Sequence, residues 1–303
     1  MAIEIAHKWP GFESFEIQTS DPDVKIRGKH GGSGPALLLI HGNPLSHMSW
    51  TNVAERLAQQ FTVIAPDIRG YGHSSKPAGA PDHSNYTFRR MAQDFIEVLN
   101  ELGVKEFSVA GHDRGARVTH RMCLDHGARI KKAAFLDILP TDFVWKELDK
   151  LDVALSLYHW TFLCQPVGFP EALLKGNEPL YIRSKLMSQG LGKGGFSEEE
   201  IQYYTELCTP ENIHGVCEDY RASATLDLQH DLADRDAGRL IECPVMLLWG
   251  QFSHTARHGA GPESIWRDYA RQIKHAEALP CGHYPVEQAP EATGDALIKF
   301  FKD

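Results

Sequence analysis

The residues best suited to chemistry lie in the segment VAGHDRGARV, residues 109–118. An apolar run predicted to be a strand ends there and a predicted helix begins, with Gly111 and Gly115 on either side of Asp113. Glycines permit the tight turn that raises the central side chain above the end of a strand. The predicted strand and helix make this pattern more specific than five residues alone. The alternative is that Asp113 only caps the helix that follows it.

A carboxylate at this turn limits the reactions that the segment can support. An aspartate that attacks a carbonyl gives an anhydride, whereas one that displaces a leaving group from an sp3 carbon gives an alkyl ester, which water then cleaves. Dehalogenation and epoxide opening are the reaction classes that remain. We therefore predict that Asp113 is a nucleophile that forms an ester intermediate.

Two further residues are predicted to hydrolyse that ester. The segment LPCGHYPVEQAPE places His283 in a loop after the last predicted strand, where it can serve as general base. The acid that orients the imidazole usually follows the preceding strand, but VMLLWGQFSHTA has Ser253 there. We predict instead Asp137, which ends the apolar run AAFLDIL, in preference to Asp142. The alternative is that Asp137 is a turn or capping residue.

The segment HGNP, residues 41–44, ends another predicted strand. We predict that the backbone N–H of Asn43 and that of Arg114 form an oxyanion hole for the tetrahedral intermediate of ester hydrolysis. Pro44 is predicted to fix a tight turn at this strand end.

Two arginines follow the predicted nucleophile. Arg114 is the next residue, and Arg117 lies four residues beyond Asp113, on the same face of the predicted helix. A guanidinium grips a carboxylate through two parallel hydrogen bonds. The pair therefore predicts a substrate with its own carboxylate beside the carbon that is attacked. The alternative is that the arginines form salt bridges that steady Asp113 and nearby acids.

These residues need a sheet to position them, and the chain predicts one. Continuous apolar runs are typical of parallel strands covered on both faces, and helices alternate with them here. The pattern predicts an α/β fold, a doubly wound, mostly parallel eight-stranded sheet with a short antiparallel start. Strands are predicted at 14–19, 24–31, 36–42, 61–67, 107–113, 133–139, 245–250 and 276–280, and helices at 48–59, 87–102, 115–126, 262–273 and 290–301.

The alternation stops between Pro140 and about Asp231. An insertion of helices at this point would lie over the carboxyl ends of the strands, where ligands bind in open α/β sheets. We therefore predict a core in two parts, residues 1–140 and 232–303, with a helical cap at 141–231. Cap helices are predicted at 145–163, 170–176, 180–189 and 197–208, and the glycine-rich segment 190–196 is predicted to be a cap loop.

The composition and charge of the chain limit the kinds of partner that it can bind. The chain has 303 residues, 42% of them hydrophobic, and a formal net charge of −9. This charge opposes binding to nucleic acid or to an anionic membrane, but a small anionic substrate can still enter a locally positive pocket. No signal segment or membrane-spanning run is visible, and the six cysteines show no CxxC spacing. We expect a cytoplasmic protein with reduced thiols and neither metal nor cofactor.

With these residues identified, the chain resembles the haloacetate (fluoroacetate) dehalogenases of the α/β-hydrolase superfamily. The resemblance extends along nearly the whole chain, through RGYGHSSKP, GHDRGAR, LDILPT, YHWTFL, CEDYRA and CGHYPVEQAP. It implies an α/β-hydrolase fold and an enzyme that converts haloacetate to glycolate and halide without a cofactor. It also implies that Asp113 displaces halide, that Arg114 and Arg117 hold the substrate carboxylate, and that Asp137 and His283 complete the hydrolysis.

The resemblance also implies a halide pocket and a homodimer. The pocket would consist of His159, Trp160 and Tyr220, whose N–H and O–H groups can solvate a departing halide. Without the resemblance, ordinary helix packing would account for His159 and Trp160.

Three positions depart from the pattern of the dehalogenases. Asn43 stands where relatives have an aromatic residue, Gln189 where they have Trp, and His254 where an aliphatic residue is usual. These polar residues predict a wider or more hydrated pocket.

Two other functions remain open at this point. An epoxide hydrolase would share the nucleophile and base but needs two cap tyrosines, of which Tyr220 could be one, and it gives the two arginines no role. A non-enzymatic receptor for a small carboxylate would not need the whole set of Asp113, Asp137 and His283.

Overall fold

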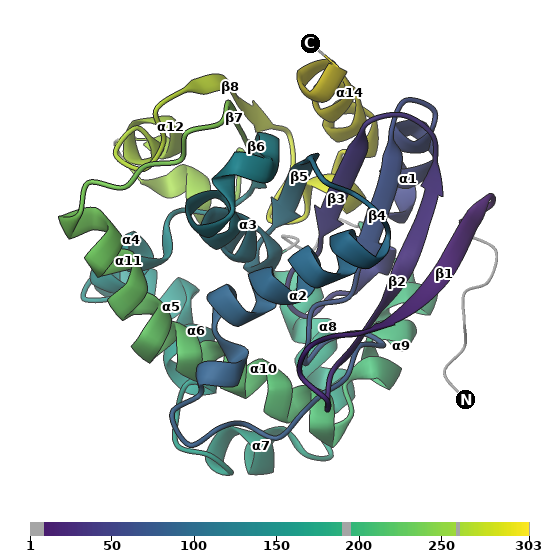
Figure 1. Cartoon of the computed structure of the whole chain (residues 1–303). Coiled ribbons are helices and arrows are strands. Elements are labelled where there is room, and N and C mark those ends of the chain that lie inside the picture. The colour runs from purple at the N-terminus through teal and green to yellow at the C-terminus, as the bar shows by residue number, and fades with distance from the viewer. Residues whose placement is uncertain (1–8, 190–194, 259–260, 303) are drawn as a thin grey trace.

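The computed structural model describes residues 9–189, 195–258 and 261–302, apart from the side chains of residues 188 and 189 (Figure 1). It contains an eight-stranded sheet with the order β1-β2-β4-β3-β5-β6-β7-β8. The first two pairings are antiparallel and the others parallel, which confirms the predicted sheet. The strands are β1 (Phe12–Gln18), β2 (Lys25–Gly32), β3 (Ala36–Ile40), β4 (Thr62–Pro66), β5 (Phe107–His112), β6 (Ile130–Leu136), β7 (Val245–Gly250) and β8 (Ile273–Leu279).

Helices cover both faces of the sheet. In the central strand β3, Leu37 and Leu39 point to one hydrophobic cluster, and Leu38 and Ile40 point to the other, as the alternation of a strand requires. The first cluster includes residues of α1 (Thr51–Ala58) and α14 (Pro290–Lys302), and the second includes residues of α2 (Phe88–Glu101), α3 (Arg114–Asp125) and α12 (Gly261–Trp266).

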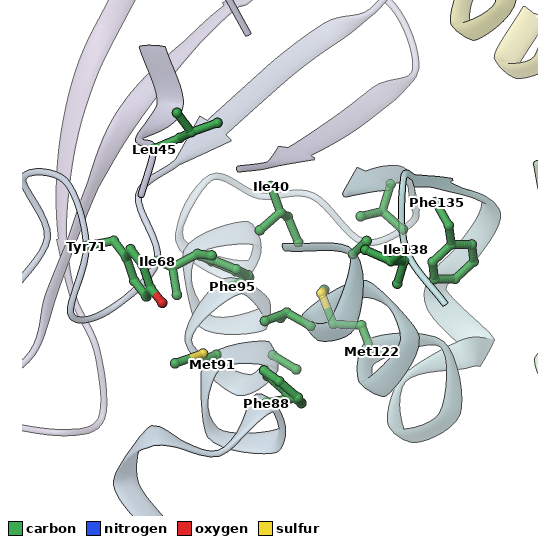
Figure 2. Close-up of a cluster of buried hydrophobic side chains, with 14 of the residues drawn as sticks. Ile40, Leu45, Ile68, Tyr71, Phe88, Met91, Phe95, Met122, Phe135 and Ile138 are labelled. Carbon is green, nitrogen blue, oxygen red and sulfur yellow. The ribbon is translucent and has the colours of Figure 1, made fainter. Parts of the chain in front are cut away.

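The second cluster fixes the position of α3. Figure 2 shows Ile40 of β3, Phe95 of α2 and Met122 of α3 in the same part of the core, and each is almost completely buried. Because α3 begins directly after β5, this packing also fixes the turn that carries Asp113. The packing of α3 in the hydrophobic core therefore fixes the position of the predicted nucleophile.

Between β6 and β7 the chain forms helices and no strand in its described part. In Figure 1 most of these helices gather in the lower part of the view. This agrees with a helical cap inserted into the sheet, while the boundaries 1–140, 141–231 and 232–303 stay a prediction. The helices are α4 (Thr141–Glu147), α5 (Leu151–Ser156), α6 (Tyr158–Leu163), α7 (Phe169–Leu174), α8 (Glu178–Gln189), α9 (Glu198–Leu207), α10 (Pro210–Ala222) and α11 (Leu228–Asp236).

Two features of this insertion differ from the sequence prediction. The single helix predicted at 145–163 is wrong, because the chain turns twice there to form α4, α5 and α6. Leu151 and Leu155 remain 75% and 68% exposed, so the apolar pattern that suggested one helix does not mark one buried face. The helix α10 was not predicted, because its buried positions include charged residues. The predicted loop at 190–196 lies mostly outside the described residues.

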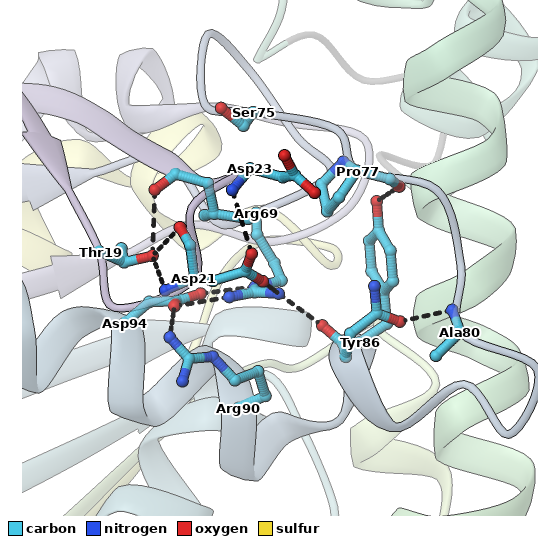
Figure 3. A network of polar contacts seen from close by, with 12 residues as sticks. Thr19, Asp21, Asp23, Arg69, Ser75, Pro77, Ala80, Tyr86, Arg90 and Asp94 are labelled. Atoms are coloured by element: carbon cyan, nitrogen blue, oxygen red, sulfur yellow. Dashed lines mark hydrogen bonds and ion pairs between the residues drawn. The ribbon is translucent and has the colours of Figure 1, made fainter.

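A buried ion network holds the loop between β4 and α2, on which α10 rests. Arg69 is completely buried and pairs with Asp94 of α2 at 2.6 Å and with Asp21 at 3.1 Å (Figure 3). The side-chain amide of Asn212 in α10 donates to the carbonyl of Gly70 at 2.9 Å. A buried cation needs carboxylate partners such as Asp94 and Asp21 to offset its desolvation. The hydrogen bond from Asn212 to Gly70 links this loop to the inserted helix α10.

Within the described residues, no helix is long and apolar enough to cross a bilayer. The six cysteines are all free.

Candidate active site

Asp113 lies on a strained turn between β5 and α3. Its backbone has φ 48° and ψ −118°, a conformation that non-glycine residues rarely adopt. A Cβ atom on Gly111 would lie 2.5 Å from the carbonyl oxygen of Gly115, and one on Gly115 would lie 2.3 Å from that of Ile40. Only glycine fits at either position. The carboxylate makes no capping hydrogen bond to α3, so the alternative of a simple helix cap is wrong.

The two oxygens of Asp113 have different partners. Oδ1 accepts a hydrogen bond from the backbone N–H of Asn43 at 2.8 Å, and Oδ2 lies 3.6 Å from Nε2 of His283. Burial alone would raise the pKa of Asp113, but the imidazole of His283 outweighs it and holds the pKa well below its usual value. Asp113 is therefore ionised and available as a nucleophile. The peptide bond from Asn43 to Pro44 is cis, within a tight turn.

His283 is held by Asp137. Its Nδ1 lies 2.6 Å from Oδ2 of Asp137, while Oδ1 accepts hydrogen bonds from the N–H of Gly250 at 2.9 Å and the hydroxyl of Ser253 at 2.6 Å. Burial would lower the pKa of His283, but the carboxylates of Asp113 and Asp137 raise it to about 9. Ser253, which stands where the acid was expected, thus orients the acid from β6.

The structure separates Asp142 from this group, since its carboxylate accepts a hydrogen bond from the hydroxyl of Tyr269. The predicted preference for Asp137 over Asp142 agrees with this geometry.

Arg114 is engaged with the inserted helices. Its guanidinium pairs with the buried carboxylate of Asp219 in α10, through Nη2 and through Nε at 2.8 Å. The Tyr71 hydroxyl donates to the same carboxylate at 2.6 Å. Nη1 of Arg114 remains buried with no hydrogen-bond partner in the structure. Arg114 therefore links α10 to the core and keeps one N–H donor, on Nη1, for a ligand. Asp219 was not predicted from the sequence.

Arg117 is a buried cation with no carboxylate partner among the described residues. Its Nη1 donates to the carbonyl of Leu139 at 3.1 Å and to the hydroxyl of Thr141 at 3.0 Å, and its guanidinium lies over the Trp160 ring, 4.5 Å from the ring centroid. Burial, followed by the charge of Arg114, lowers the pKa of Arg117 to about 10. The alternative was that the two arginines form salt bridges that steady Asp113 and nearby acids. Arg114 does pair with a nearby acid, Asp219, whereas neither arginine pairs with Asp113 in the described contacts.

The three residues predicted to bind halide come together from two helices. His159 and Trp160 of α6 contact Tyr220 of α10 edge-on, with ring centroids 5.9 and 6.0 Å apart. Burial, with a contribution from the charge of Lys185, holds the pKa of His159 well below its usual value, so this imidazole is neutral. The side-chain amide of Asn43 lies 3.5 Å from the Tyr220 hydroxyl, which places one of the departures from the family pattern beside this cluster.

A cavity of about 300 Å³ opens above Asp113. Asp113, Arg117, Asp137, His159, Trp160 and His283 line it, together with His254 and Arg257. The side chain of Gln189 lies outside the described residues. Within those residues, no group of three or more His, Cys, Asp or Glu side chains is placed to hold a metal ion.

Comparisons with known proteins agree with this geometry. The family model of the α/β hydrolase fold matches residues 35–180. A fluoroacetate dehalogenase from Burkholderia sp. is 41% identical over 96% of this chain and 95% of its own length. The chain belongs to the haloacetate dehalogenase family of α/β-hydrolases.

Two further comparisons show which other proteins this member of the dehalogenase family resembles. A solved α/β hydrolase structure from Nostoc sp. PCC 7120 has a TM-score of 0.89 and 42% identity, covering 96% of this chain and 98% of its own. A soluble epoxide hydrolase from Corynebacterium sp. (strain C12) is 31% identical over 89% of this chain and 91% of its own length. The fold and the family predicted from the sequence are confirmed.

Two functional candidates in this family member were not found from the sequence. His112 is buried, and its Nε2 lies 2.7 Å from the backbone carbonyl of His283, so it positions the histidine loop. Lys185 of α8 is 3% exposed, and within the described residues its ammonium has no ion pair or hydrogen bond. Burial and the charge of Arg114 lower the pKa of Lys185 to about 8. The signal for Lys185 was its spacing with Ile182 and Leu186 on one helix face.

Proposed function

We propose that the chain catalyses hydrolytic removal of halide from a 2-haloacid and converts a haloacetate to glycolate. The observation that carries this proposal is Arg117, a buried guanidinium that lines the same cavity as Asp113 and has no described carboxylate partner. A buried charge without a counter-ion is costly, and a substrate carboxylate would supply that counter-ion beside the nucleophile. The similarity to a fluoroacetate dehalogenase supports the same reaction.

The first step is a displacement at C2 of the substrate. Oδ2 of Asp113 forms a bond to C2, the carbon–halogen bond breaks, and the halide leaves with the bonding electron pair. Arg117 and the unpaired Nη1 of Arg114 hold the substrate carboxylate, while His159, Trp160 and Tyr220 donate to the halide. Neutral donors suit this task, because they stabilise the leaving anion without forming a permanent ion pair with it.

The second step hydrolyses the ester on Asp113. His283 accepts a proton from water, and the water oxygen attacks the carbonyl carbon of the ester. The N–H of Asn43, which already binds Oδ1 at 2.8 Å, and the N–H of Arg114 stabilise the resulting oxyanion. Collapse of this intermediate breaks the bond between the carbonyl carbon and the glycolate oxygen, which takes the proton from the His283 imidazolium. The carboxyl group of Asp113 then loses the remaining proton of the water to solvent, and Asp137 stabilises the imidazolium until it has given up its proton.

Halide release tests the proposed function. We expect chloride, bromide and fluoride from chloro-, bromo- and fluoroacetate, measured by ion chromatography. Styrene oxide is the control substrate for the other reaction class. Diol formation without any halide release would contradict the proposal.

The epoxide hydrolase remains a second candidate, because the 31% identical relative carries that activity in its name. The structure adds that Tyr158 lines the cavity and that the Tyr220 hydroxyl lies beside Asn43, so two cap tyrosines are near the site. This alternative still leaves Arg117 without a counter-ion. The homodimer and the cytoplasmic location stay predictions.

We predict that Arg117→Leu lowers kcat/KM for chloroacetate by roughly ten- to a hundredfold, since a charge-assisted hydrogen bond contributes about 1.5–3 kcal/mol. Arg117→Lys should recover little activity, because lysine keeps the charge but lacks the planar fork. The melting temperature should stay near that of the wild type, since no buried carboxylate loses its partner.

Arg114→Leu is the matched comparison. It should lower both kcat/KM and the melting temperature, because Asp219 would then be a buried and unpaired carboxylate. Wild-type kinetics in both variants would show that neither arginine binds substrate.

The pH dependence of the two steps should differ. In the resting enzyme Asp113 is ionised, so the rate of ester formation should be flat from about pH 5 to 8. Ester formation removes the negative charge of Asp113, and the pKa of His283 then falls below its resting value of about 9. Below that pKa the imidazole is protonated and cannot accept the proton of water, so hydrolysis and kcat should fall about tenfold per pH unit.

Rapid-quench measurements of halide release, compared with steady-state kcat over the same pH range, check this prediction. The ester should accumulate at low pH, visible by intact-protein mass spectrometry. An acidic limb in halide release with a flat kcat would overturn the assignment of the steps.

A further inference from the structure

The cavity above Asp113 is larger than a haloacetate requires. A haloacetate has two carbons, two oxygens and one halogen, and at about 30 Å³ for each group of the size of water it fills at most about 150 Å³. The cavity measures about 300 Å³. Since Arg117, His159 and Trp160 surround the carboxylate and the halide in the proposed function, the remaining space lies on the side of a substituent at C2.

The lining of that remaining space changes from apolar to polar. Ile138, Val144 and Leu157 form its apolar part, and the cavity also reaches His254 and Arg257. The same two residues border a second cavity of about 350 Å³. His254 and Arg257, at the 3-10 turn η5 (Thr255–Arg257), therefore stand at the junction between the two cavities.

Arg257 has an unpaired guanidinium. Among the arginines in the described residues, it is the one whose side chain forms neither an ion pair nor a hydrogen bond; all others have at least one of these contacts. In a chain of net charge −9, acidic partners are abundant. Arg257 lines both cavities and is exposed, so its guanidinium is hydrated until an anionic ligand in the cavity replaces that water.

His254 adds a second polar group without a partner. Its Nδ1 is buried and has no hydrogen bond in the structure, while its Nε2 lies 3.3 Å from Nε2 of His258. Nδ1 of His258 in turn lies 3.5 Å from Glu147. Nδ1 of His254 can donate to an anion only if Nε2 of His254 accepts a hydrogen from Nε2 of His258. Because Nδ1 of His258 faces Glu147, this arrangement makes His258 an imidazolium whose charge Glu147 compensates. An anion in the cavity would select this arrangement of protons.

We propose that His254 and Arg257 form a subsite for a second carboxylate, so that the preferred substrates are 2-halodicarboxylic acids with the distal carboxylate at this junction. This inference rests on the proposed function and names its substrate class. The aliphatic part of the substituent would pack on Ile138, Val144 and Leu157. Glu147, Lys150 and Asp152 line the second cavity, and Lys150 pairs with Glu147. The negative charges of Glu147 and Asp152 oppose entry of a carboxylate beyond the junction.

Matched pairs of substrates test the subsite. Racemic 2-chlorosuccinate, 2-chloroglutarate and 2-chloroadipate are compared with 2-chlorobutanoate, 2-chloropentanoate and 2-chlorohexanoate, which have the same number of carbons. We expect kcat/KM for at least one diacid to exceed that of its monoacid. Arg257→Gln should reduce this ratio by about five- to tenfold, as expected for a charged hydrogen bond near the surface. Arg267→Gln, in an exposed arginine that pairs with Glu263, should leave the ratio unchanged.

A binding measurement separates this inference from the reaction itself. Adipate, glutarate and succinate should raise the melting temperature of the wild type more than the corresponding monoacids do, and Arg257→Gln should abolish the difference. Absence of halide release from chloroacetate would overturn the proposed function, whereas this binding difference would still support the subsite. Equal diacid-to-monoacid ratios and equal thermal shifts in wild type and Arg257→Gln would overturn the subsite.

Discussion

We expect Asp113→Asn to release no measurable halide from chloroacetate while the protein remains folded. A neutral amide is a poor nucleophile toward an sp3 carbon. The other described aspartate with a positive φ, Asp137 at 50°, cannot replace Asp113, because Gly250, Ser253 and His283 already occupy its carboxylate. Halide release from freshly purified protein measures the loss, and circular dichroism checks the fold. Mass spectrometry of the same sample excludes deamidation back to aspartate.

Asp142→Asn is the matched control for this variant. Asp142 belongs to the same stretch of chain as Asp137 but contacts Tyr269 instead of His283, so its substitution should leave halide release close to that of the wild type. Full activity in Asp113→Asn, with deamidation excluded, would remove the nucleophile from the mechanism.

His283→Asn should release about one halide per active site and then stop. Displacement by an ionised carboxylate requires no proton transfer, whereas attack of water on the ester requires a base. The variant should therefore carry a glycolyl ester on Asp113 after treatment with chloroacetate. Intact-protein mass spectrometry detects the adduct, and ion chromatography counts the halide.

His275→Asn controls for the loss of a histidine, since His275 is on β8 and pairs with Glu277. This control should turn over like the wild type. Repeated turnover by His283→Asn would show that another group is the base. Absence of both halide and adduct in folded protein would show that His283 acts before displacement.

The core of the fold could be predicted because its signals are local. The apolar runs that became β3, β5 and β6 are continuous, as buried parallel strands require, and the glycines around Asp113 mark a turn that other residues cannot form. The residues at these strand ends were therefore predictable from the sequence alone. Asp137 and His283, which are far apart in the sequence, meet at 2.6 Å because parallel strands end at one edge of a sheet.

The inserted helices were harder to predict because their buried positions are not consistently apolar. In α10, Asp219 is completely buried beside Tyr220 and is compensated by Arg114 from the core. A pattern of hydrophobic residues does not reveal such a position, because its burial depends on an ion pair with a distant segment. Lys185 was missed for a related reason. Its spacing with Ile182 and Leu186 places it on the buried face of α8, but lysine is rarely buried without a partner, so a pattern of apolar residues does not include it.

The oxygen atom that reaches the product tests the covalent mechanism most directly. A single turnover with enzyme in excess over chloroacetate is run in water labelled with oxygen-18, and the products are analysed by mass spectrometry. The account predicts that the glycolate hydroxyl carries unlabelled oxygen from Asp113, while the label enters the Asp113 carboxylate, within the tryptic peptide of residues 106–114. Labelled glycolate with an unlabelled peptide would show that water attacks C2 directly and would contradict the ester mechanism.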